Sequence, residues 1–297
     1  MSSITALKAG AGRVLRLPKV VVLFYLVNLI ASLVVVAPAA LLIGQRLSHS
    51  FENDRLYSNV DIAWVIETLY HFQWWPPQGI AITLASVGLL YFVLNTFLAG
   101  GALAVLHRDT EPFFSSCARH FFPLLRLMFV SLIFYGVVWG LSDAVSKAIA
   151  RAREMSMEAH LWIIADWIQL SIVFLLLGIV NMIFDYGKIV CVATGQRGAI
   201  RATFAALRFV AGNSGRTLSV YWICSITGLG FLLAYYGMTQ AAAQNSPFII
   251  ALVFLLRQLY TLTRMWVRLW TWSSELQLYT FNSTIVAPVP PSLGVAE

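Results

Sequence analysis

LWIIADWIQLSIVFLLLGIVNMIF runs from Leu161 to Phe184, and TLSVYWICSITGLGFLLAYYGM runs from Thr217 to Met238. Each stretch is long and apolar enough for a helix that crosses a bilayer, which takes roughly 20 residues. The connection between them, residues 185–216, contains five Lys or Arg and one Asp. Short loops rich in Lys and Arg stay on the cytoplasmic side. The hairpin therefore predicts two spans with a cytoplasmic connection, and it sets the orientation of the whole chain.

Composition extends this prediction to all 297 residues. Hydrophobic residues make up 59% of the chain and charged residues 11%, against roughly 45–50% and 25% in soluble domains. With a mean hydropathy of +0.77, a soluble globular protein is excluded. The pI near 9.5 follows from cytoplasmic Lys and Arg, so nucleic-acid binding is not expected. The three cysteines include no CxxC pair, and a structural disulfide is not expected.

The same criteria predict an all-α, polytopic membrane protein with six transmembrane helices and both termini inside. Fourteen of the 20 Lys and Arg then lie inside, five lie outside and one lies within a span. Tryptophans fall near span ends, as expected at membrane interfaces. We expect residues 1–281 to form a single transmembrane domain and residues 282–297 to form a loose cytoplasmic tail. The spans are about 19–45, 79–106, 124–145, 161–184, 217–238 and 247–272.

Two amphipathic elbow helices are predicted on the cytoplasmic side, where such helices lie along the membrane surface. The first covers about 110–122 and ends near Pro123, and the second covers about 197–211. A basic lead-in at 1–18 and a short outer helix at 60–72 are also expected. Along the second elbow, three arginines lie within about 40° of one another, and apolar residues cover the adjoining face: Arg197, Arg201 and Arg208, then Ile200, Phe204, Leu207 and Ala211.

Two weaker patterns concern packing. Span two, the first elbow and span three match span four, the second elbow and span five in order, with Gly101 and Gly187 in comparable places. We interpret this as a weak parallel repeat. Gly136 and Gly140 form a GxxxG pair, which lets helices approach closely and is also common by chance in membrane helices.

The last helix carries charges that a membrane helix normally lacks. Arg264 and Arg268 lie near the inner interface, where snorkelling side chains explain them. Arg257 lies about 15 Å deep at 1.5 Å per residue, where an arginine costs roughly 2.5–3.5 kcal/mol. We therefore expect Arg257 to face the protein interior. The polar residues of this helix fall within about 80° of arc: Arg257, Thr261, Arg264, Arg268, Thr271 and Glu275.

Two interpretations of Arg257 remain open. It forms a buried pair that docks the sixth helix on the fourth, or it lines a polar cavity that attracts an anionic substrate or lipid headgroup. Asp185 and Lys188, three residues apart, are a candidate inner-rim pair, either as a local ion pair or in a coupling role. The candidate intramembrane polar cluster is Arg257, Asp166, Asn95, Gln169, Arg264 and Arg268.

Motifs of catalysis and cofactor binding are absent from the sequence. It contains no HExxH, CxxC, CxxCH, GxSxG, phosphate-binding loop or dinucleotide-binding glycine pattern. An intramembrane enzyme would need a nucleophile with a base at matching depth, and no such pair is found. We therefore predict no catalytic residue, no metal and no cofactor, and we expect a protein that is not an enzyme.

Four stretches together resemble a known group of proteins. They are GAGRVLRLPKVVVLFYLVNLI (10–30), NTFLAGG (95–101), FDYGKIV (184–190) and the arginine-bearing last helix. Their order resembles an uncharacterised family of bacterial six-span integral inner-membrane proteins, over nearly the whole chain. It is also distantly similar to the membrane domains of glycerophosphodiester phosphodiesterases. The resemblance implies a multi-pass protein of the bacterial inner (cytoplasmic) membrane. It carries over no activity, because the chain has no room for that enzyme's catalytic domain.

Two functions follow as hypotheses. The first is a non-enzymatic accessory or scaffold component of the inner membrane, which packs against a membrane-protein partner or organises lipid. The alternative is a transporter or lipid-handling permease with a midplane cationic site around Arg257. The expected partners are the lipid bilayer, a membrane protein or an anionic lipid. A cavity open to one side and lined by Arg257, Asn95 and Asp166 would favour transport. A dry, paired Arg257 would favour a scaffold.

Overall fold

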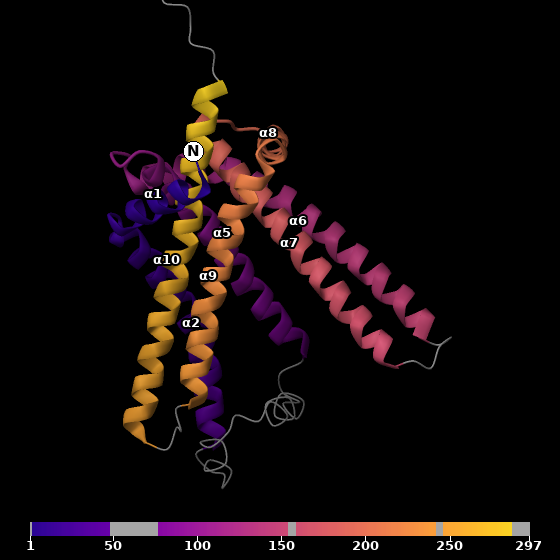
Figure 1. Ribbon diagram of the computed structural model, residues 1–297. Coiled ribbons are helices and arrows are strands. Elements are labelled where there is room, and N and C mark those ends of the chain that lie inside the picture. Colours follow the sequence, from indigo (N-terminus) through magenta and orange to yellow (C-terminus); the bar gives the residue numbers. More distant parts are fainter. Residues whose placement is uncertain (1, 48–76, 154–158, 242–245, 287–297) are drawn as a thin grey trace, which may run out of the picture. The chain divides into compact units, whose positions relative to one another are not determined.

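The computed structural model of the chain describes residues 2–47, 77–153, 159–241 and 246–286. In these ranges the regular secondary structure is helical throughout, without a strand. Figure 1 shows the helices in chain order. They are α1 (Ser3–Leu15), α2 (Pro18–Leu47), α5 (Pro77–His107), α6 (Phe113–Arg153), α7 (Ala159–Thr194), α8 (Ala199–Gly212), α9 (Ser214–Ala241) and α10 (Pro247–Val286).

Five of the described helices are long and apolar enough to cross a membrane. The number is six if α1 and the start of α2, which are bent by 76° at their break, count as one broken span. Only 6% of the most apolar 18-residue stretch of α7 is buried. A surface this apolar is stable against lipid and not against water, and a helix satisfies its backbone polar groups internally. The all-α prediction is confirmed, and the long apolar helices are those of a multi-pass membrane protein.

Each predicted span lies within one helix, but two boundaries are wrong. The first elbow is not a separate helix, because α6 begins at Phe113 and continues through Pro123 to Arg153. A proline inside a helix costs about 3 kcal/mol. In lipid, however, leaving the helix would expose several unpaired backbone groups, which costs more. The predicted start of the tail at 282 lies inside α10, which continues to Val286, and the rest of the predicted tail lies outside the described residues. The predicted outer helix at 60–72 lies outside the described residues.

The helix predicted for the second elbow is present as α8, over Ala199–Gly212. Its C-cap residue Asn213 donates its backbone N–H to the carbonyls of Phe209 and Val210, and α9 begins at the next residue. Small side chains on one face of α8 allow close packing against α6 and α7. The buried residues of that face are Ala199, Ala202, Thr203, Ala206 and Val210.

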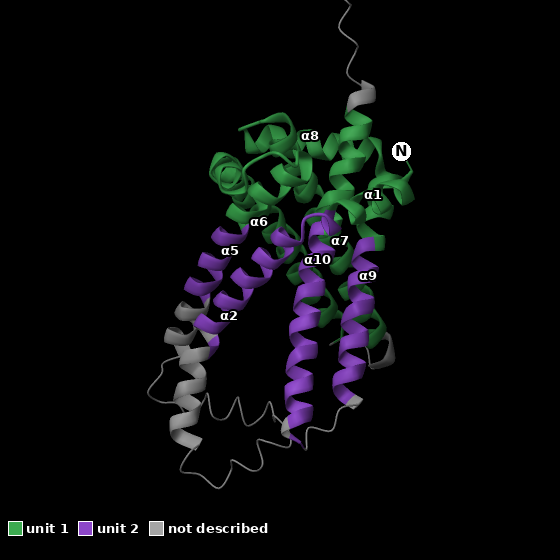
Figure 2. Cartoon of the chain, turned by 90° about the vertical axis from the view of Figure 1, so that its left-hand side faces the viewer, with its two compact units in different colours: residues 1–13, 96–223, 270–297 green, residues 14–95, 224–269 purple. Residues whose placement is uncertain are grey.

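The chain divides into two compact units, coloured separately in Figure 2. Unit 1 comprises residues 1–13, 96–223 and 270–297, and unit 2 comprises residues 14–95 and 224–269. In unit 1, α6 and α7 run side by side (Figure 1), and α8 packs on both. In unit 2, α10 is bonded to α2, because Tyr25 Oη donates to Gln258 Oε1 at 2.9 Å.

Glycines bring two helices of unit 1 close to α6. At Gly101 of α5, an added Cβ would lie 2.4 Å from Cys117 Sγ and 2.8 Å from the Phe113 carbonyl oxygen. At Gly187 of α7, an added Cβ would lie 3.1 Å from Leu127 Cδ2. The two glycines of the predicted repeat therefore both permit close helix packing, but they face different parts of α6.

Candidate functional site

Asp185 of α7 accepts hydrogen bonds from three side chains and is only 5% exposed. Lys188 Nζ lies 2.7 Å from Asp185 Oδ1 and also 5.4 Å from the centre of the Trp272 ring. Trp272 Nε1 donates to the same oxygen at 3.1 Å, and Asn181 Nδ2 donates to Oδ2 at 3.3 Å. The ion pair of the predicted inner rim is therefore part of a buried cluster that joins α7 to α10 in unit 1.

Glu275 of α10 is the second acidic group of this cluster. It is fully buried, and neither of its carboxyl oxygens has a hydrogen-bond partner among the described residues. Asp185 and Lys188 lie close enough to act on it electrostatically. The hydroxyls of its neighbours Ser273 and Ser274 are buried in the same way. A buried carboxyl without donors is costly, and ionisable residues held inside a membrane protein mark functional positions by default.

Asn181 extends the cluster to two further helices. Tyr135 Oη of α6 donates to Asn181 Oδ1 at 3.3 Å, and Asn181 Nδ2 donates to Tyr221 Oη of α9 at 3.0 Å. The sequence analysis predicts neither Asn181 nor Trp272 as a site residue. A signal existed for Asn181, which precedes Gly187 by six residues just as Asn95 precedes Gly101.

Asp166 and Gln169, predicted as intramembrane partners of Arg257, have partners within unit 1. Asp166 is paired with Arg153 of α6, and both side chains are about half exposed. Gln169 Nε2 donates to Ser142 O at 2.9 Å and to Ser146 Oγ at 2.6 Å. Both contacts join α6 to α7, so these two residues stabilise one helical hairpin.

Asn95, Arg257, Arg264 and Arg268 lie in unit 2, which brings Asn95 and Arg268 together. Arg268 Nη1 donates to Asn95 Oδ1 at 3.1 Å, and Asn95 is only 7% exposed. Arg257 is exposed, and its Nε donates to Tyr235 Oη of α9 at 3.4 Å. The Tyr235 ring stacks on Tyr260 with centroids 4.8 Å apart. Two of the three arginines of α10 thus bond to uncharged acceptors.

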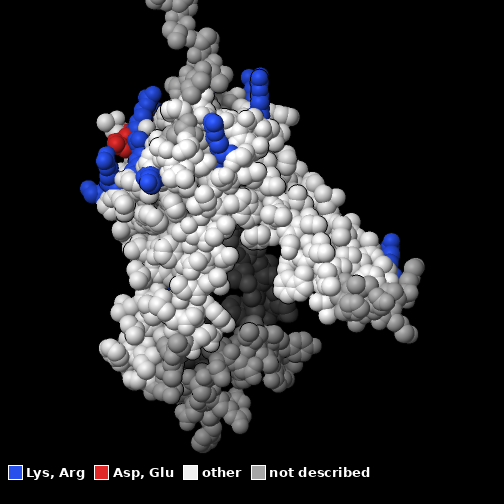
Figure 3. Space-filling model, viewed as in Figure 1, with Lys and Arg blue, Asp and Glu red and all other residues white. Residues whose placement is uncertain are grey.

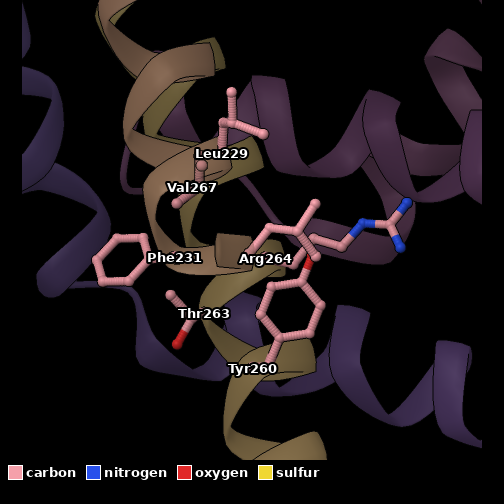
Figure 4. Close-up of a pocket in the computed structure, with 8 residues that line it drawn as sticks. Leu229, Phe231, Tyr260, Thr263, Arg264 and Val267 are labelled. Carbon is pink, nitrogen blue, oxygen red and sulfur yellow. The ribbon is translucent and has the colours of Figure 1, made fainter. Parts of the chain in front are cut away.

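Arg264 lies beside a groove of about 470 Å³ between α9 and α10. Figure 4 shows its side chain extending to one side of this groove, with Phe231 on the other side. Arg264 forms no hydrogen bond or ion pair with the part of the chain that the structure describes. The rest of the lining is mostly apolar: Gly228, Leu229, Leu232, Tyr260, Thr263 and Val267.

No group of three His, Cys, Asp or Glu side chains that could hold a metal ion occurs in the described ranges. Cys117, Cys191 and Cys224 are buried free thiols. Comparisons of the chain with protein-family models, with curated proteins and with solved structures each gave no match.

Proposed function

We propose that this protein is a non-enzymatic scaffold of the membrane that gathers anionic lipid along α8. The observation that supports the proposal is the division of α8 into three faces. One face is buried against α6 and α7. The second exposes apolar side chains, and the third exposes arginines. The exposed residues are Ile200, Phe204 and Leu207 on the apolar face, and Arg201 and Arg208 on the basic face, while the exposed Arg197 precedes the N-cap Gly198 and is not helical.

The basic face of α8 has no acidic counterpart. Neither of its two arginines, nor Arg197 just before the helix, forms an ion pair with a residue that the structure describes. Figure 3 shows Lys and Arg at the end near α1 and α8, and a mostly white flank along α6 and α7 with a blue group at its far end. Unpaired guanidinium groups beside exposed apolar side chains are typical of a helix that lies in the interface of an anionic leaflet.

The exposed groups are sufficient for firm attachment to such a leaflet. Each basic residue near an anionic surface contributes about 1 kcal/mol, so three contribute about 3 kcal/mol. Ile200 is 65% exposed, Phe204 67% and Leu207 45%. Because full burial of such a side chain contributes about 1.5–3 kcal/mol, their exposed parts correspond to about 3–5 kcal/mol.

The proposal includes a topology and a location. Six spans with both termini inside put α8 on the cytoplasmic side, where Lys and Arg accumulate. The negative surface potential of the cytoplasmic leaflet attracts basic segments of this kind. The resemblance to six-span bacterial proteins supports the bacterial inner membrane as its place.

The test measures contact between α8 and lipid in the full-length protein. Ala211, on the exposed apolar face, is replaced by Cys and labelled with a small fluorophore, and the protein is reconstituted in vesicles. Brominated phosphatidylglycerol should quench the label about threefold more than brominated phosphatidylcholine. Arg201→Gln/Arg208→Gln should abolish the difference, whereas Lys147→Gln/Arg151→Gln, which removes the same charge from the end of α6, should preserve it. A label that neither lipid quenches would refute the proposal.

A lipid-handling permease is the second candidate. It is favoured by the polar side of α10, where Arg257 bonds to Tyr235 and Arg268 bonds to Asn95 within apolar helices. A scaffold of purely apolar helices would not need these bonds. The two functions differ in transport. A permease accelerates the movement of fluorescent phosphatidylglycerol across proteoliposomes and loses this activity in Arg257→Leu, whereas a scaffold leaves the rate equal to that of protein-free vesicles.

A further inference from the structure

The groove between α9 and α10 combines an apolar floor with one guanidinium. Leu229 and Phe231 come from α9, and Val267 and Arg264 come from α10. The volume of about 470 Å³ falls in the usual range for small-molecule sites, roughly 300–1,000 Å³. Figure 4 shows Arg264 and Phe231 on different sides, so one side of the groove is cationic and the other is apolar. This is the arrangement that an amphiphile matches.

The charge of Arg264 has no acidic neighbour among the described residues of its unit. The described residues of unit 2 contain no Asp or Glu at all, although they include Arg257, Arg264 and Arg268. An arginine on a membrane helix costs up to about 2.5–3.5 kcal/mol at the centre of the bilayer. None of the described residues of unit 2 supplies an anion for Arg264, and a bound anionic lipid would supply one.

The position of Arg264 along α10 indicates which molecule supplies that anion. Arg264 follows Pro247, the first residue of α10, by 17 residues, or about 26 Å at 1.5 Å per residue. The hydrocarbon core is about 30 Å thick, so the guanidinium is close to the phosphates of one leaflet. Guanidinium binds phosphate oxygens in bidentate geometry. The acyl chains of the same lipid lie on the hydrocarbon side of Arg264, beside Leu232 of α9.

We propose that this groove binds one anionic glycerophospholipid, with its phosphate on Arg264 and one acyl chain over Phe231 and Leu232. Tyr260 Oη is available to the headgroup as a further donor, because no described residue bonds to it. Thr263 Oγ1 already donates to Leu259 O at 2.9 Å, so it serves only as an acceptor. The groove is separate from the exposed faces of α8, and the inference stands whether or not α8 gathers lipid.

The groove offers a steric test beside the electrostatic one. An added Cβ at Gly228 would touch only Val267 Cγ1, at 3.4 Å, so a larger side chain there enters the groove without a clash at its base. Two residues further along α9, an added Cβ at Gly230 meets nothing within 4 Å, and Gly230 does not line the groove. Gly228→Leu therefore fills the site, and Gly230→Leu is its matched control.

The experiment counts lipids retained by the full-length protein in native mass spectrometry, titrated from detergent with phosphatidylglycerol or phosphatidylcholine of identical chains. The wild type should retain one phosphatidylglycerol at a concentration about tenfold lower than phosphatidylcholine. Arg264→Gln should remove that preference and Arg264→Lys should restore part of it. Gly228→Leu should remove this high-affinity binding of a single lipid (the tight step), whichever lipid is titrated. Gly230→Leu should leave it unchanged.

Three outcomes would overturn the inference. They are a tight step that survives Arg264→Gln, equal retention of the two lipids, and displacement of the lipid by millimolar inorganic phosphate. The last would identify a phosphate site in place of a lipid site. Arg201→Gln/Arg208→Gln should leave the single tight step intact, so a failure of the α8 proposal and a failure of this one give different results.

Discussion

Asp185 provides the sharpest test of the buried cluster. Asp185→Asn keeps the shape of the side chain and one acceptor oxygen, but it removes the charge that faces Lys188 at 2.7 Å. Of the three bonds to Asp185 only the one from Trp272 joins two helices, and an interhelical hydrogen bond in a membrane protein contributes about 0.6 kcal/mol. Removing one partner of a buried ion pair costs about 3–5 kcal/mol, because the other charge is left behind. The Lys188 side chain is 27% exposed, which favours the lower end, about 3 kcal/mol.

The free energy of unfolding is measured by steric trapping in lipid nanodiscs. Asp185→Asn/Lys188→Met removes both charges and should recover at least half of the loss. Asp143→Asn is the matched control, because its bond to Lys147 at 2.6 Å joins two side chains that are each more than half exposed. Such surface pairs contribute about 0.3–0.5 kcal/mol. If Asp185→Asn costs no more than this control, Lys188 is solvated and our account of the cluster is wrong.

Three further predictions concern packing, burial and topology. Gly101→Ala should lower the free energy of unfolding by about 1–3 kcal/mol, because its Cβ would overlap Cys117 Sγ. Gly136→Ala, whose Cβ would meet nothing within 4 Å, should leave that free energy unchanged or raise it by up to about 1 kcal/mol. Thermal unfolding in detergent compares the two variants. Glu275→Met should stabilise the protein by about 1–3 kcal/mol, since it removes a buried carboxyl without donors; a loss of stability would reveal a partner for that carboxyl. Ser214→Cys should react with a membrane-impermeant maleimide only in inverted vesicles, and labelling of intact cells would reverse the proposed orientation.

The helices could be predicted from the sequence because an apolar segment in lipid has to satisfy its own backbone hydrogen bonds. Apolar runs in lipid must pair their backbone groups within one segment, so all six predicted spans fall inside helices. The error at Pro123 has the same origin. The sequence predicts a helix end at Pro123 by a rule that holds for soluble proteins. There a helix can end at a proline at little cost in free energy, because water hydrogen-bonds to the backbone groups that become unpaired. In α6 the apolar residues after Pro123 remove that option, and the helix continues.

Side-chain partners were predictable only where they are local in the chain. Asp185 and Lys188 are three residues apart on α7, and spacing alone brings them together. Trp272 reaches Asp185 from 87 residues away, and no pattern along one helix reports such a contact. The depth argument offered Asp166 as a partner for Arg257. In the structure Asp166 is paired with Arg153, which helix α6 carries beyond the predicted end of its span.

The polar side of α10 carries an acidic residue in its unit 1 part and three arginines in its unit 2 part. Its unit 1 part carries Glu275, in a cluster that already contains Asp185 and Lys188. Its unit 2 part carries Arg257, Arg264 and Arg268 in a described region without any acid. Hydrogen bonds to charged groups contribute about 1.5–3 kcal/mol, so Tyr235 and Asn95 offset much of the cost of Arg257 and Arg268. No described residue does this for Arg264. A phospholipid headgroup is the anion that the membrane itself supplies at that depth.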